Sequence, residues 1–170
     1  MERVIHPFPP IYDSESRILI LGTFPSVKSR EGEFYYHHPQ NRFWRVISGL
    51  FNEPLPVTLE EKKQLLKRNR IAVWDVIQSC EITGSSDSSI RNVVPNDIPS
   101  LLLQTGIREV FANGGMAYRL YQRYIRPHTE REILQLSSTS PANAGCSLEQ
   151  LMEQWSCLKT VLTKQENSNT

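Results

Sequence analysis

Runs of apolar residues along the chain predict four short strands. Residues 17–22 contain four consecutive branched aliphatic residues before a glycine, a pattern typical of a strand that is buried on both faces. Similar apolar runs follow at 71–74, 109–112 and 132–136. Because continuous apolar strands are typical of parallel sheets covered on both sides, we expect these segments to form one mainly parallel sheet.

The segments between these strands have apolar residues at helical spacing. We predict helices over 41–51, 59–70, 95–106, 116–125 and, along a wide apolar stripe, 148–162. Capping boxes that start at Thr58 and Ser147 support two of these helices. Strands that alternate with helices indicate the α/β class. We therefore predict a three-layer α/β/α sandwich with a four-stranded, mainly parallel sheet.

The remaining segments are predicted to be irregular. Residues 1–16 are rich in proline, which fixes φ and removes a backbone donor, so we expect an extended lead-in and no helix. The serine-rich stretch from Ser79 to Asn92 predicts a long loop. Residues 165–170 are polar and predict a disordered tail. The chain is therefore expected to be a single domain over 1–164 with a polar tail over 165–170.

The charge of the chain is almost balanced, which argues against a histone-like basic protein. Its 170 residues include 19 Lys or Arg and 18 Asp or Glu, which gives a net charge of +1. Basic residues are nevertheless concentrated at 28–45, where four accompany two acidic residues, and at 116–131, where four accompany one. Such a local concentration predicts a modestly basic face, which is enough to bind nucleic acid weakly.

The spacing of the cysteines and the hydropathy of the chain argue against metal-binding, secreted and membrane proteins. Cys80, Cys146 and Cys157 show no C-x-x-C spacing, so we expect free thiols and no zinc or iron–sulfur site. The N-terminus lacks the apolar core of a secretory leader, and no apolar run of 18 residues occurs. These features predict a soluble protein that is neither secreted nor bound to a membrane.

Chemistry is expected where the predicted parallel strands end. In α/β sheets, ligands bind outside the carboxyl ends of the strands, which selects the segments 22–41, 74–87 and 137–146. The first segment combines aromatic, histidine and basic residues, a composition that suits a stacked base with a phosphate nearby. The last is small and polar, so a phosphate could approach its backbone closely.

Four motifs in these segments carry a resemblance to a known family. They are Leu-Gly-x-x-Pro-Ser at 21–26, Tyr-Tyr-x-His-Pro-x-Asn at 35–41, Val-Trp-Asp-Val at 73–76 and Ser-Pro-Ala-Asn-Ala at 140–144. The chain resembles the uracil-DNA glycosylase superfamily, and within it the hypoxanthine-DNA glycosylase (DNA-deoxyinosine glycosylase) branch. The string His-Pro-x-Asn-Arg-Phe-Trp at 38–44 also resembles the helix start of the mismatch-specific uracil-DNA glycosylases.

The resemblance implies a monofunctional hydrolase of N-glycosyl bonds that removes hypoxanthine from deaminated DNA in base excision repair. It implies no cofactor, no metal, a DNA partner that contains a damaged base, and a monomer. The location implied is the cytoplasm of a prokaryote with its nucleoid, or wherever the genome lies. Because the glycosidic bond is hidden in duplex DNA, such an enzyme must extrude the nucleotide into a pocket.

Site residues follow from the positions of the motifs. The resemblance implies that Asn41 positions the attacking water and that Tyr36 stacks on the extruded base. The other residues implied to contact the base are Phe24, Trp74, Asp75 and Asp87. Those implied to bind the DNA strand are Ser26, Arg42, Ser140, Pro141, Ala142, Asn143 and Ala144.

Two departures from the family pattern keep other functions open. Phe24 stands where the mismatch-specific enzymes have a water-binding asparagine, and Ala144 stands where relatives commonly carry a leucine wedge. Removal of uracil or mismatched thymine is one alternative, and a damaged-DNA or nucleotide-binding module without catalysis is another. Asn41 could also serve only as a helix cap, and Asp75 and Asp87 only as turn residues.

Overall fold

A parallel four-stranded sheet forms the centre of the molecule. The computed structural model describes the backbone over residues 2–168 and side chains over 2–165. The central sheet has the order β3-β2-β6-β7, built from β2 (Ile18–Gly22), β3 (Ile71–Asp75), β6 (Glu109–Asn113) and β7 (Ile133–Leu136). All residues of β2 are buried, as the continuous apolar run predicts for a strand with neighbours on both sides.

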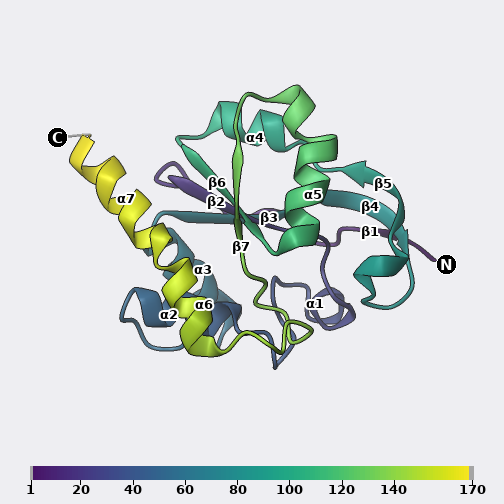
Figure 1. Cartoon of the computed structure of the whole chain (residues 1–170), viewed down its shortest axis with the longest axis horizontal. Coiled ribbons are helices and arrows are strands. Elements are labelled where there is room, and N and C mark those ends of the chain that lie inside the picture. Colours follow the sequence, from purple (N-terminus) through teal and green to yellow (C-terminus); the bar gives the residue numbers. More distant parts are fainter. Residues whose placement is uncertain (1, 169–170) are drawn as a thin grey trace.

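Side-chain alternation along the strands divides the core into two halves. Ile18 and Ile20 pack into one half, whereas Leu19 and Leu21 pack into the other. One face of the sheet is covered by α2 (Phe43–Leu50), α3 (Leu59–Arg68), α6 (Leu148–Trp155) and α7 (Cys157–Ser168). The opposite face is covered by α4 (Ile98–Gln104) and α5 (Gly115–Tyr124) (Figure 1). The predicted three-layer α/β/α sandwich is therefore confirmed.

A second, antiparallel sheet was not predicted. It has the order β1-β4-β5 and consists of β1 (Glu2–Ile5), β4 (Ile77–Ile82) and β5 (Arg91–Pro95). The prediction of one loop over 79–92 is therefore wrong, since this stretch contains most of β4, the short 3-10 turn Asp87–Ser89 and the start of β5. These strands mix polar and apolar residues, and strand pairing together with a small cluster around Phe24, Ile77 and Ile82 stabilises them.

Two helical details also differ from the predictions. The stripe over 148–162 is divided by Ser156 into α6 and α7, and α7 continues to Ser168. The expected tail is therefore helical over 165–168, while residues 169–170 lie outside the described part. The helix α1 (Val27–Gly32) was not predicted, because it has no apolar stripe and begins at the capping side chain of Ser26. A 3-10 turn, Arg126–His128, follows α5.

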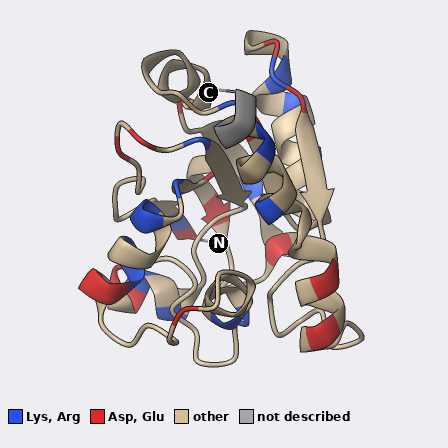
Figure 2. Cartoon of the chain, turned by 90° about the vertical axis from the view of Figure 1, so that its left-hand side faces the viewer, with Lys and Arg blue, Asp and Glu red and all other residues tan. Residues whose placement is uncertain are grey.

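The strand order creates a crevice at one edge of the sheet. From β2 the chain crosses to β3 on one side and later returns to β6 and β7 on the other side. The carboxyl end of β2 is therefore the point where the direction of winding reverses, which is where α/β folds bind ligands. Acidic and basic residues are interspersed along the ribbon in the view of the left-hand side of the molecule (Figure 2). None of the helices within residues 2–168 is long and apolar enough to cross a membrane.

Candidate active site

A cavity of about 560 Å³ opens at this crevice. Residues from the segments 22–29, 35–41, 85–88 and 138–142 line it, together with Asp75 and Asn113. It thus draws on the ends of all four parallel strands, and its size is typical of small-molecule sites. The three segments selected from the sequence do meet here, joined by the end of β6, which the sequence analysis did not include.

Asn41 lies on the wall of the cavity immediately before α2. Its Oδ1 atom accepts hydrogen bonds from the backbone N of Phe43 at 2.9 Å and from Oγ1 of Thr139 at 2.8 Å. A carbonyl oxygen has two lone pairs, so both are occupied. The Nδ2 donors have no hydrogen-bond partner among the described residues. Asn41 is therefore both a helix-capping residue and a cavity residue, and the group it offers a ligand is a donor.

Thr139 and Asn113 hold Asn41 in place. The Asn113 side chain donates from Nδ2 to Thr139 Oγ1 at 3.0 Å and accepts from the Thr139 backbone N at 3.0 Å. Thr139 is fully buried and Asn113 nearly so, which makes this network rigid. Sequence reasoning missed Asn113, although its place at the carboxyl end of a strand was a usable signal.

Tyr36 forms a platform inside the cavity. Its ring stacks on Phe43 with a centroid separation of 4.1 Å, so Phe43 supports one face of the ring, and Tyr36 also lines the cavity. The backbone has φ 51°, a left-handed conformation that a bulky residue adopts only when its surroundings hold it there. The buried hydroxyl has no hydrogen-bond partner among the described residues. Burial, and then the charge of Asp75, raise the pKa of Tyr36, so it remains an O–H donor.

Asp75 ends β3 at the floor of the cavity and makes an unexpected hydrogen bond. Its Oδ2 atom lies 2.7 Å from Nε2 of His6, and the two side chains are only 5% and 3% exposed. A Cβ atom on Gly22 would lie 2.4 Å from Asp75 Oδ1 and 3.0 Å from the Tyr36 hydroxyl. Only glycine allows these two groups to converge at the end of β2. No sequence signal pointed to His6, because its proline-rich segment reaches the site through the unpredicted strand β1.

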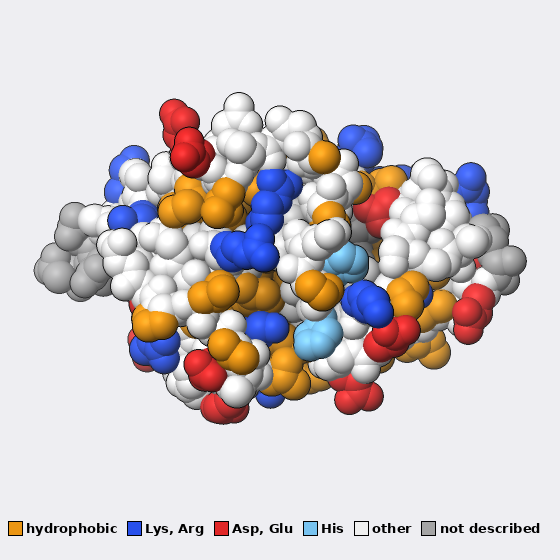
Figure 3. All heavy atoms as spheres, turned by 90° about the horizontal axis from the view of Figure 1, so that it is seen from below, with side chains coloured by type: hydrophobic (Ala, Val, Ile, Leu, Met, Phe, Trp, Pro, Cys, Tyr) orange, Lys and Arg blue, Asp and Glu red, His pale blue; other side chains and the backbone are white. Residues whose placement is uncertain are grey.

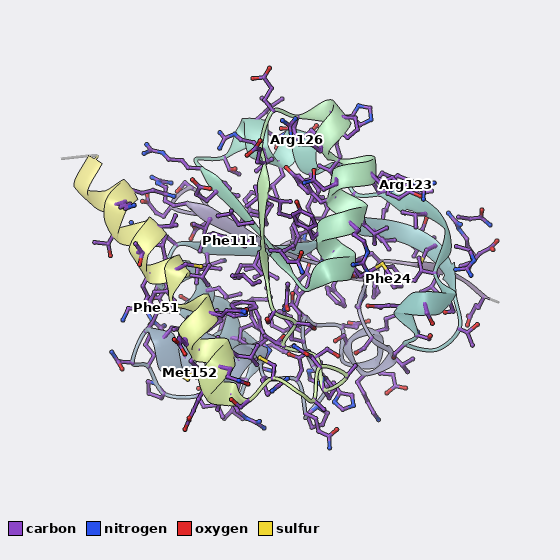
Figure 4. The ribbon with its side chains drawn as sticks, viewed as in Figure 1. Phe24, Phe51, Phe111, Arg123, Arg126 and Met152 are labelled. Atoms are coloured by element: carbon purple, nitrogen blue, oxygen red, sulfur yellow. The ribbon has the colours of Figure 1, made fainter. Side chains whose placement is uncertain are left out.

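Phe24 and Asp87 border the cavity from the side of the second sheet. Phe24 is nearly buried, packs in the cluster of β4 and has the Arg30 guanidinium 5.7 Å from its ring centre. Figure 4 shows Phe24 between α5 and the second sheet. The pKa of Asp87 is raised, first by desolvation and second by the charge of Asp75. Phe24 therefore contributes an apolar wall and Asp87 an acidic rim.

Arg42 has a different position from the one expected for a DNA contact. Its guanidinium donates to the backbone oxygens of Asn143 at 3.0 Å and Ser140 at 3.3 Å, and also to that of Cys146. Asn143 in turn donates from Nδ2 to the oxygen of Ser138 at 2.9 Å. Arg42 and Asn143 thus fix the shape of the loop 138–146 from inside, and neither lines the cavity.

The other predicted DNA and base contacts are divided between the rim and the core. Ser26, Ser140, Pro141 and Ala142 line the cavity, whereas Ala144 is exposed outside it. Trp74 does not line the cavity, so the structure gives no support to its predicted base contact. Its side chain lies within β3 and packs against both halves of the core, because alternation along the strand directs it away from the floor that Asp75 occupies.

The basic residues do not form one continuous patch near the cavity. Seen from below, Lys and Arg side chains are scattered around two histidine side chains and separated by neutral groups (Figure 3). Of the arginines of 116–131, Arg119 and Arg123 lie within α5, and Arg126 and Arg131 come after it. This helix leaves the carboxyl end of β6 and runs back along the sheet. Arg123 lies in the last turn of α5 and Arg126 just after it, so both lie away from the start of this helix (Figure 4). The predicted basic face is thus split between two regions.

Comparison with known proteins places this site in a family. The family model of the uracil DNA glycosylase superfamily matches residues 9–160, and the chain belongs to that superfamily. A solution NMR structure of a candidate uracil DNA glycosylase from Methanosarcina acetivorans is similar, with a TM-score of 0.76 and 32% identity. That similarity covers 92% of this chain and 99% of the other chain.

Two curated relatives are named hypoxanthine DNA glycosylase. The protein from Methanosarcina barkeri is 34% identical over 109 residues, which is 63% of this chain and 69% of the relative. The protein from Methanosarcina acetivorans is 40% identical over 95 residues, which is 55% of this chain and 60% of the relative. The predicted resemblance to the hypoxanthine branch is thereby confirmed at the level of sequence similarity.

Proposed function

We propose that this chain is a monofunctional DNA glycosylase that hydrolyses the N-glycosidic bond of a deaminated base, with hypoxanthine as the preferred base. One observation carries the proposal: a single cavity brings together Asn41, Tyr36 and Asp75 at the switch point of the sheet. An amide, an aromatic platform and a carboxylate suit an extruded base better than they suit a phosphate group alone. The names of the two curated relatives support the choice of hypoxanthine.

In the proposed complex the extruded base lies on the free face of Tyr36. Phe43 supports that ring from behind, so the ring does not need to move when the base arrives. The Tyr36 hydroxyl and the Asp75 carboxylate lie at the floor, where they face the polar edge of the base. Phe24 closes the side of the cavity, and the serine-rich rim faces the strand on either side of the extruded nucleotide.

Asn41 is proposed to hold the attacking water through its amide nitrogen. Since Oδ1 already accepts two hydrogen bonds, the water contact falls to Nδ2, which lacks a partner among the described residues. An amide is a poor base, so the rate must come largely from positioning the water and stabilising the departing base. Hydroxyl, amide and carboxylate groups around the cavity favour direct attack by water over attack by an amine.

The proposal includes the partner and place of action. The substrate is DNA with a deaminated base, and the protein acts as a monomer in the compartment that contains the genome. Binding to undamaged DNA is expected to be weak, because the net charge is only +1 and the basic residues are divided between two regions.

Cleavage assays on defined duplexes test the function. Oligonucleotide duplexes carry one hypoxanthine, uracil or mismatched thymine, and alkali converts each abasic site into a strand break. We expect release of hypoxanthine to be fastest, with strand breaks only after alkali. Faster release of uracil or thymine would make that base the preferred substrate in place of hypoxanthine. Tight binding without any release at stoichiometric protein would favour the alternative of a damaged-DNA-binding module without catalysis.

A further inference from the structure

His6 reaches the floor of the cavity from a distant part of the chain. It follows β1, and its backbone N donates to the oxygen of Gln78 at 2.7 Å, so the second sheet fixes its position. Its ring packs edge-on against Phe8 with a centroid separation of 4.6 Å and lies 6.0 Å from that of Phe24. The aromatic surroundings leave the imidazole one polar contact among the described residues, the Asp75 carboxylate.

The two oxygens of Asp75 have different surroundings. Oδ2 receives the hydrogen bond from His6, since a carboxylate can only accept. Oδ1 lies beside Gly22 and has no hydrogen-bond partner among the described residues. Unlike the Tyr36 hydroxyl, Oδ1 is not fully buried, so it is open to accept a hydrogen bond from a group in the cavity. Asp75 lines the cavity, and a ligand is the natural source of that hydrogen bond.

We propose that His6 is a positioning residue that sets base specificity by holding Asp75 so that Oδ1 accepts a ring N–H from the extruded base. The proposal rests on the glycosylase function proposed above. Hypoxanthine carries this N–H at N1, next to its exocyclic oxygen, and uracil presents the same pair at N3. Adenine has a lone pair at N1, which the carboxylate repels. The pair therefore selects hypoxanthine against the adenine from which it arises.

The histidine is required because an isolated buried carboxylate would lose this selectivity. Without its donor, Asp75 is expected to rotate away from the position that the His6 hydrogen bond fixes. A rotated carboxylate would no longer accept the N–H at N1 of hypoxanthine, so the preference over adenine would fall. His6 thus acts on the base only through Asp75. The N-terminal segment thereby becomes part of the recognition machinery, although it lies outside all the loops that carry the other site residues.

The test compares hypoxanthine with unsubstituted purine, which has a lone pair at N1 and no exocyclic group. Single-turnover release and duplex binding are measured for the wild type, His6→Leu and His6→Gln, with Phe8→Leu as a control for loosening of the same segment. We expect His6→Leu to lower the preference for hypoxanthine over purine by about 10- to 100-fold. His6→Gln, which places a donor near the Nε2 position, should restore most of that preference.

The outcomes separate this inference from the proposed function. An unchanged preference in His6→Leu, or an equal loss in Phe8→Leu, would overturn the positioning role even if the enzyme remains active. A wild type that releases no base would overturn the proposed function. The binding preference for the hypoxanthine duplex over the purine duplex would then still decide whether His6 and Asp75 read the base edge. Circular dichroism and thermal melts show whether each variant is folded.

Discussion

At the scale of single residues, the Asn41 side chain both stabilises the start of α2 and lines the cavity. Its oxygen joins the start of α2 to Thr139, while its nitrogen remains for the cavity. The sequence motif singled out this residue, and capping was an equally good explanation of the same asparagine. The structure shows that the capping role uses the oxygen, so any catalytic role belongs to the nitrogen.

Asn41→Asp separates these roles, because aspartate keeps the capping oxygen and replaces the N–H donors by a second acceptor. We expect single-turnover release of hypoxanthine to fall by roughly 100-fold or more, since one positioned donor is lost. The melting temperature should change little. Activity at or above the wild-type level would instead indicate that a carboxylate activates the water, which would contradict donation from Nδ2.

Gly22 is important because the side chains of Asp75 and Tyr36 approach it closely. Gly22→Ala would place a Cβ atom 2.4 Å from Asp75 Oδ1, so the carboxylate must move. We expect a loss of stability of about 1–3 kcal/mol and a larger loss of hypoxanthine release. Gly145→Ala is the matched control, because a Cβ there has no neighbour within 4 Å. Equal activity of the two variants would mean that the position of Asp75 is unimportant.

At the scale of elements, the loop 138–146 owes its shape to Arg42 at the start of α2. The guanidinium donates to carbonyl oxygens of this loop, so a residue predicted to contact DNA also organises a second segment that is predicted to bind the strand. Arginine suits this role because its planar group presents several donors in fixed directions. Lysine could satisfy only part of this pattern.

The salt dependence of DNA affinity distinguishes two roles of Arg42: holding the loop 138–146 in shape and contacting a DNA phosphate. If Arg42 only shapes the loop, Arg42→Lys weakens DNA binding without changing the slope of log affinity against log salt. A direct phosphate contact removed by Arg42→Ala would make that slope shallower by about 0.9. Arg45→Ala is the comparison, because Arg45 is exposed on the same helix. Limited proteolysis of the loop in Arg42→Ala should report its loosening.

At the scale of the whole molecule, the charge distribution predicts how the protein finds damage. Basic and acidic residues are interspersed along the ribbon, and Arg123 and Arg126 lie near the end of α5, away from its start beside the cavity residue Asn113. Non-specific binding is therefore expected to involve few phosphates, with a salt slope shallower than about −4 for undamaged duplex. A hypoxanthine duplex should bind more tightly with a similar slope. A much steeper slope would reveal an extended basic surface.

The sequence alone determined the layered core and the family. Continuous apolar runs specify strands buried on both faces, and helical spacing specifies the covering helices, because these patterns depend on local geometry and burial. The resemblance carried by the motifs also found the segments that line most of the cavity. Trp74 was misplaced, since a motif does not say to which side of a strand each side chain points.

Only the tertiary structure decided which groups meet. The second sheet has no continuous hydrophobic run, because its strands mix polar and apolar residues and their pairing helps to stabilise it. That pairing brings His6 to Asp75, 69 residues away along the chain. The contact of Thr139 with Asn41 likewise spans 98 residues. Local propensities fix periodic elements, whereas hydrogen bonds between distant segments depend on how those elements pack, and the chemistry of this site depends on those bonds.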